Sequence, residues 1–126
     1  MKQLFLSAAI LTVSLGLCIG ANAYVARCAS QTLDDVAQAQ TFALRQEREQ
    51  AERALAAAQQ RWTAAVKWLE IFLPHDEADE ISRMLASLGE YVQTPDADDF
   101  RSGCAEVCFL LEHMTRMQQL SIQNIL

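Results

Sequence analysis

Residues 4–26 of this 126-residue chain read LFLSAAILTVSLGLCIGANAYVA, an uncharged run flanked by Lys2 and Arg27. As a helix, these residues would be about 35 Å long, enough to cross a bilayer core of about 30 Å. The run has no polar face, which argues against a buried helix of a soluble domain. It therefore predicts that residues 1–26 are a signal anchor or signal peptide and that residues 27–126 form a separate domain.

This N-terminal segment has two interpretations. Ala21, Asn22 and Ala23 match a signal-peptidase site, and cleavage there would secrete a chain that begins at Tyr24. The apolar run is long for a signal peptide, however, and a retained helix would place Tyr24 at the outer interface, where aromatic rings are favoured. We favour a single-pass anchor in the cell membrane. Both interpretations place residues 27–126 outside the cytoplasm, because Lys2 and the amino terminus favour the cytoplasmic side.

The remaining 100 residues have the composition of an all-α domain. Glycine occurs four times and proline twice in the whole chain, and good helix formers dominate between them. No clear run of alternating β-branched residues predicts a strand. We expect an all-α fold in which the N-terminal transmembrane or signal helix is followed by a small antiparallel bundle of three or four helices.

Apolar spacing and helix-boundary residues predict the individual helices. We expect them over residues 30–44, 48–73, 76–92 and 97–115, followed by a docked apolar tail at residues 121–126. Residues 45–53 leave open whether the first two are one helix, because this interval is almost wholly polar but contains no glycine or proline. Local propensity favours one helix. A helix over residues 30–73 would be about 65 Å long, however, and this length favours a turn near residues 45–48.

The sharpest apolar pattern lies toward the C-terminal end, at the alternating intervals of four and three that mark one helix face. Its members are Phe100, Cys104, Val107, Leu111 and Met114. We predict that this stripe packs in the core against apolar residues of the two preceding helices, namely Trp62, Leu69, Leu85 and Leu88.

The charge of the domain excludes some classes of partner. Beyond residue 26 the chain has 9 basic and 16 acidic residues. Nucleic-acid phosphates require a basic surface, and anionic lipids attract basic clusters. We therefore expect neither nucleic-acid binding nor broad adhesion to anionic membranes.

Cysteine and histidine are the residues that could carry chemistry. Cys104 and Cys108 lie one helical turn apart, with His113 five residues later, and thiolates and imidazoles are zinc ligands. The two cysteines supply only half of a tetrahedral site, and His75 would have to come from another helix. Buried cysteines are commonly small core residues, so we favour that role and expect free thiols and no metal or cofactor. The parallel Cβ directions on one helix also disfavour a disulfide.

Several short stretches resemble a known family. They are Trp62, residues 72–77 (FLPHDE), residues 109–114 (FLLEHM) and residues 120–126 (LSIQNIL). The chain is similar to the short bacterial proteins grouped as domain of unknown function 4363. The resemblance implies an N-terminal apolar segment, a helical body and a single-pass envelope protein of Gram-positive, often spore-forming, bacteria. It implies no known activity and no catalytic residue. It also suggests a turn near residues 45–48, where the family's aspartate is replaced by Gln46, Glu47 and Arg48.

The sequence contains no convergent set of nucleophile, base and oxyanion donors. We therefore expect a non-enzymatic interaction or accessory module of a membrane or envelope complex, with a protein partner in the envelope. The alternative is a small metal-binding or thiol-dependent protein that uses Cys104, Cys108 and a histidine.

Overall fold

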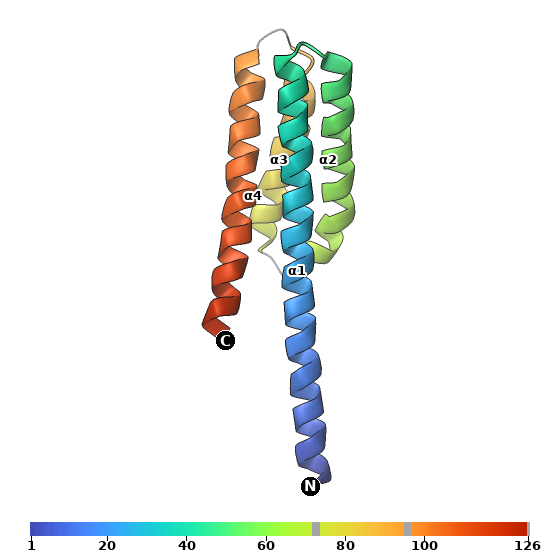
Figure 1. The fold of residues 1–126 in the computed structure, drawn as a ribbon, viewed down its shortest axis with the longest axis vertical. Coiled ribbons are helices and arrows are strands. Elements are labelled where there is room, and N and C mark those ends of the chain that lie inside the picture. Colours follow the sequence, from blue (N-terminus) through green and yellow to red (C-terminus); the bar gives the residue numbers. More distant parts are fainter. Residues whose placement is uncertain (72–73, 95–96, 126) are drawn as a thin grey trace.

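The computed structural model describes residues 1–71, 74–94 and 97–125, without the side chains of residues 97, 121, 122 and 125. In this part of the chain it contains four helices and no strand (Figure 1). They are α1 (Lys2–Leu44), α2 (Arg48–Leu69), α3 (His75–Tyr91) and α4 (Ala97–Ile125). The predicted all-α class is confirmed.

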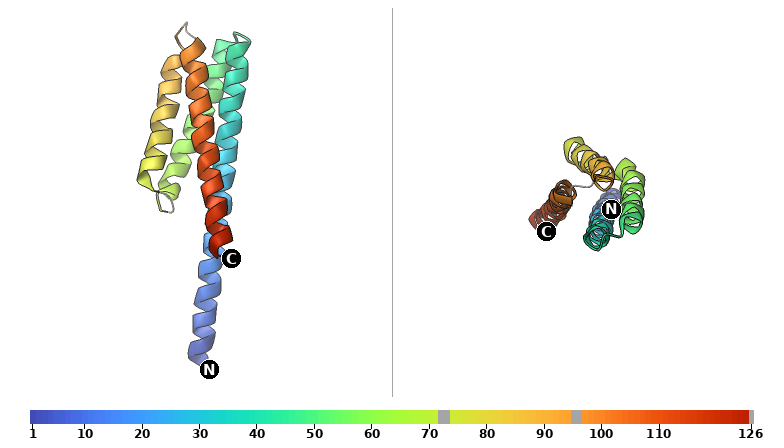
Figure 2. Two further views of the ribbon diagram at one scale, coloured as in Figure 1. Left: turned by 90° about the vertical axis from the view of Figure 1, so that its left-hand side faces the viewer. Right: turned by 90° about the horizontal axis from the view of Figure 1, so that it is seen from above.

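The helices run alternately up and down and form a ring in chain order (Figures 1 and 2). Within the described residues, α1 packs against α2 and α4, and α3 also packs against α2 and α4. The α1–α3 and α2–α4 pairs therefore lie across the bundle from each other. The N-terminal half of α1 projects beyond the other three helices, so one end of the bundle faces this projection and the other end is distal to it.

The first helix joins the apolar segment to the bundle without a break. Its side chains are exposed up to residue 20, and fully buried positions begin at Val25 and recur at helical spacing. The buried set is Val25, Cys28, Ala29, Thr32, Val36 and Ala39. Thr32 Oγ1 donates a 2.8 Å hydrogen bond to the Cys28 carbonyl oxygen, which satisfies its hydroxyl inside the core. The predicted helix start at residue 30 is thus wrong, because the apolar helix continues directly into the amphipathic one.

The turn near residues 45–48 is present and separates α1 from α2. Glu47 N–H donates to Phe42 O at 2.9 Å, and Gln46 N–H donates to Ala43 O at 3.1 Å. This pair of bonds is the Schellman arrangement that closes a helix C-terminus. It requires a left-handed residue, and Gln46 takes that role with φ 63°. The two interpretations of residues 30–73 are thereby resolved in favour of two helices.

Polar contacts fix α2 against α3. Trp62 Nε1 donates to Ser82 Oγ at 2.9 Å, and Ser82 Oγ donates to Ala78 O at 2.9 Å. Gln59 Nε2 donates to Leu85 O at 2.8 Å.

α2 ends at Leu69 rather than at the predicted residue 73, whose placement lies outside the described residues.

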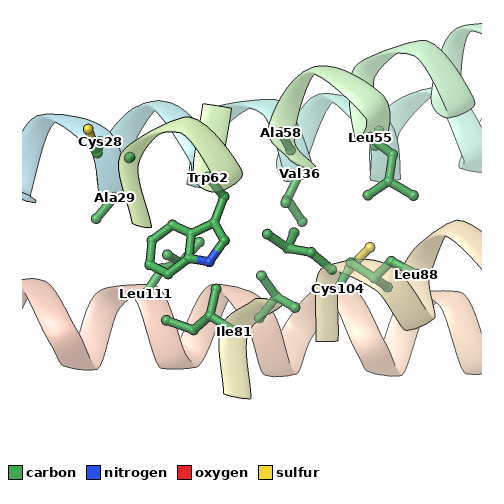
Figure 3. Packing of buried hydrophobic residues seen from close by; sticks show 14 of the residues in the cluster. Cys28, Ala29, Val36, Leu55, Ala58, Trp62, Ile81, Leu88, Cys104 and Leu111 are labelled. Atoms are coloured by element: carbon green, nitrogen blue, oxygen red, sulfur yellow. The ribbon is translucent and has the colours of Figure 1, made fainter. Parts of the chain in front are cut away.

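The predicted core residues are all buried and belong to one apolar cluster (Figure 3). Trp62 of α2 reaches toward Ile81 of α3 and Leu111 of α4. The predicted partners of the α4 stripe are incomplete, however. They came only from α2 and α3, whereas the neighbours of α4 around the ring are α3 and α1.

The last helix is longer than predicted. It continues to Ile125, although the sequence predicted an end at residue 115 and a separate tail. Residues 116–125 contain no glycine or proline, so nothing in them ends a helix. The predicted docking of residues 121–126 depends on side chains at 121, 122, 125 and 126 that lie outside the described residues.

Candidate functional site

Cys104 is placed as a core residue. Its side chain is fully buried beside Leu88 (Figure 3). Burial, and secondly the neighbouring Cys108, raises the pKa of the Cys104 thiol from 9.0 to about 12. Burial, and secondly Glu112, also raises the pKa of Cys108, which is half-buried. All four cysteines of the chain are unpaired in the structure. Both thiols on α4 are thus held in the neutral form, which is a poor nucleophile and a poor metal ligand.

The histidines do not join these cysteines. His113 is exposed, and its ring stacks on Phe109 at a centroid distance of 6.2 Å. His75 begins α3, and Leu88, the neighbour of Cys104, lies 13 residues further along that helix, or about 20 Å. Among the described residues, no group of three or more His, Cys, Asp or Glu side chains is placed to hold a metal ion.

A cleft lies at the distal end of the bundle. It has a volume of about 590 Å³, within the range of small-ligand sites. It is formed where α1 ends, α2 begins, α3 ends and α4 begins (Figure 1). The residues around it are Gln40, Ala43, Leu44, Gln46, Arg48, Tyr91, Val92, Thr94, Phe100 and Arg101.

The chemistry of the distal cleft is cationic and aromatic. Arg48 and Arg101 contribute guanidinium groups, and Tyr91 and Phe100 contribute aromatic rings. Among the described residues around the cleft there is no Asp, Glu, His or Cys. Its two guanidinium groups can therefore bind a carboxylate through charge-assisted hydrogen bonds. None of its described residues is a conventional general base or thiol nucleophile.

Sequence reasoning missed this cleft. Its members are spread from residue 40 to residue 101 and converge only when all four helices meet. The one available signal was Arg48 beside a turn, and within residues 45–53 that arginine has the appearance of an ordinary solvated charge.

Comparison with known proteins gives a family and no activity. A family model described as Domain of unknown function (DUF4363) matches residues 19–125. The chain belongs to this family. The match takes in the last part of the apolar segment of α1, the bundle half of α1, and all of α2, α3 and α4. No curated protein and no solved structure matches the chain.

Proposed function

We propose that this member of the family is a single-pass membrane protein whose helical bundle lies outside the cytoplasm and binds a protein partner, without catalysis. The observation that carries the proposal is the continuity of α1. One helix contains an exposed apolar part long enough to cross a membrane and then contributes its other half to the bundle core. A signal sequence would also be apolar and N-terminal, so retention of residues 4–26 in the mature protein needs a measurement of its own.

We further propose that the distal cleft is the contact surface for the partner. Arginine and tyrosine are enriched among the residues that dominate binding energy at protein interfaces. Two arginines at one concave site also contrast with the acidic balance of the whole domain. The cleft suits an acidic or carboxylate-bearing segment of another envelope protein. Its position at the end furthest from the apolar part of α1 would present it away from the membrane.

The alternative thiol-dependent or metal-binding function receives less support. Cys104 contributes to the core, where its neutral thiol packs as a small apolar group. Its two possible histidine partners lie apart from it, at the start of α3 and on the exposed surface of α4.

Photocrosslinking in the native envelope tests this proposal. A benzophenone amino acid at Leu44, an exposed residue of the cleft, should capture a discrete partner. Arg48→Glu combined with Arg101→Glu should abolish that product by reversing the charge of the cleft. Arg83→Glu, an exposed charge reversal on α3 outside the cleft, is the matched control and should preserve it.

Two results would contradict the proposal. One is a crosslinked product that survives the double arginine reversal in a folded protein. The other is a folded Cys104→Ala, Cys108→Ala variant that no longer gives the crosslinked product and has lost copurifying zinc, which would favour the alternative.

A further inference from the structure

The last turns of α4 lie at the height where the apolar run of α1 ends. Ala29 and Ser30 of α1 share a groove of about 370 Å³ with Arg116 and Gln119 of α4. From Gln119, α4 continues for six residues to Ile125, or about 9 Å, antiparallel to α1. That distance takes its end to about the height of Tyr24. Both side views show the end of α4 extending beyond the nearby ends of α2 and α3 (Figures 1 and 2).

This end of α4 carries no charged side chain. The sequence of residues 117–126 is MQQLSIQNIL, and all 16 acidic residues of the chain lie between positions 34 and 112. The nearest charged side chain is Arg116. Residues 4–26 of α1 and residues 117–125 of α4 both lack charged side chains, and they therefore occur together at the same end of the molecule. Charged side chains are costly in a membrane, so their absence from both segments is compatible with a shared lipid environment.

Two apolar side chains on this end of α4 are half-exposed among the described residues. Met117 and Leu120 are 51% and 49% exposed, and their spacing of three places them on neighbouring parts of the helix surface. Leu111 and Met114, one to two turns earlier on the same helix, are buried.

We infer that residues 117–125 of α4 form a second membrane contact, lying in the outer interface of the bilayer beside α1. This inference rests on the proposed anchoring of α1. The ligand is a zwitterionic lipid surface, because the segment has apolar and uncharged polar side chains but no basic cluster for anionic headgroups. Two contacts on separate helices would fix the tilt and rotation of the bundle, and hence the direction in which the distal cleft faces.

The contact is confined to α4. The neighbouring ends of α2 and α3 carry exposed Glu70 and Asp76, which would resist insertion. Those ends stop short of the end of α4, so the bundle can place α4 in the interface while the two carboxylates remain in water.

Fluorescence quenching by brominated lipid tests the inference with the full chain in phosphatidylcholine vesicles. The background is Trp68→Phe, which leaves the buried Trp62 as a constant signal. In that background, the tryptophan of Leu120→Trp should lose most of its emission when the acyl chains are brominated near the headgroups. Ala105→Trp is the matched control, at an exposed site about 22 Å further up α4, and its emission should be unchanged.

A parallel measurement distinguishes failure of the α4 contact from failure of the proposed α1 anchor. Resistance of the same vesicles to carbonate extraction reports whether α1 is inserted. Quenching of Leu120→Trp no greater than that of Ala105→Trp, in carbonate-resistant protein, would overturn the α4 contact and leave the anchor intact. A protein partner would then be the covering of this face. Extraction by carbonate would show that α1 is not an anchor, and the inference would fail with it.

Discussion

Cys104 shows how a residue that suggests chemistry in the sequence can serve the core. Its side chain has no exposed surface, and its raised pKa of about 12 has burial as its first cause. Below the ordinary thiol pKa of 9.0, the group is neutral in both the folded and the unfolded chain. Its contribution to stability is therefore fully present there and is lost as the pH rises from about 9 toward 12.

The raised pKa of Cys104 predicts how the stability of the protein depends on pH. We expect the free energy of unfolding to fall between pH 9 and pH 11 by a larger amount in the native chain than in Cys104→Ala. Urea unfolding at a series of pH values measures the free energy of unfolding of both proteins. Subtracting the values of the variant from those of the native chain cancels the contributions of the titrating groups that the two proteins share. Equal pH slopes for the two proteins would show that the Cys104 thiol ionises freely in the folded state.

Leu111 tests the core at the centre of α4. It is 1% exposed and lies opposite Trp62 in the cluster (Figure 3). Leu111→Ala should lower the free energy of unfolding by about 2–5 kcal/mol, through lost apolar burial and the cavity that remains. Phe109→Ala, at a 62% exposed position two residues earlier, should change it by less than about 0.5 kcal/mol. Chemical denaturation of both variants measures the contrast, and similar losses would mean that the stripe is not the core.

At the scale of elements, the sequence could place a possible turn after α1 near residues 45–48, but it could not decide whether the helix breaks there. Residues 45–48 contain neither glycine nor proline, and opposite charges four apart favour a continuous helix there. One of those pairs forms inside α2, between Glu49 and Arg53 at 2.7 Å. What breaks the helix is the packing of α1 on α2, which requires the chain to reverse direction. Tertiary contacts thus override local propensity at Gln46.

That override predicts a stabilising substitution. Gln46 has φ 63°, a left-handed conformation that is costly for a residue with a Cβ atom and free of that cost for glycine. Gln46→Gly should raise the free energy of unfolding by about 0.5–1 kcal/mol, because the Schellman turn keeps its hydrogen bonds and loses its strain. The same substitution at Gln60, an exposed residue inside α2, should instead destabilise by about 1 kcal/mol. Thermal unfolding of the two variants compares them, and a destabilising Gln46→Gly would rule out strain at the turn.

The helix ends were the least predictable elements. The apolar stripe of α4 was evident in the sequence because its spacing is regular, and all five of its residues are buried. The share of residues 25–29 of α1 in the core was not evident, since Val25 lies inside an apolar run whose length and lack of charge predict a membrane segment throughout. Whether such a residue faces protein or lipid depends on which helices lie beside it. That information resides in the three-dimensional arrangement rather than in the spacing.

At the scale of the whole molecule, the bundle class follows from composition, but the candidate contact surface does not. The distal cleft combines residues from the ends of all four helices, and its two charged members, Arg48 and Arg101, lie far apart in sequence. Helix ends are also where sequence patterns are weakest. The apolar segment, in contrast, could be identified from its length and lack of charge alone, and in the structure it is exposed over its whole apolar window.

The proposed orientation of the whole chain rests on the charge at its N-terminal end. Lys2 and the amino group favour the cytoplasmic side, and Arg27 on the other flank weakens this bias without reversing it. Alkaline phosphatase joined after Leu126 through a flexible linker should therefore be active, because its disulfides form only outside the cytoplasm. The same fusion without residues 4–26 should be inactive. An inactive but intact fusion to the full chain would mean that the bundle lies inside the cell.

Retention of the segment needs its own measurement, because the fold permits either outcome. Cleavage after Ala23 would leave every core position from Val25 onward in the mature chain, so the bundle could fold in both cases. The two forms differ in what holds the bundle at the membrane, since a cleaved chain would have only the end of α4 for that purpose. We expect mass spectrometry of the mature protein to find residues 4–26 still attached and the protein to remain in the membrane fraction after carbonate treatment. A mature N-terminus at Tyr24 would instead make the protein secreted and would remove the anchor on which the orientation of the distal cleft depends.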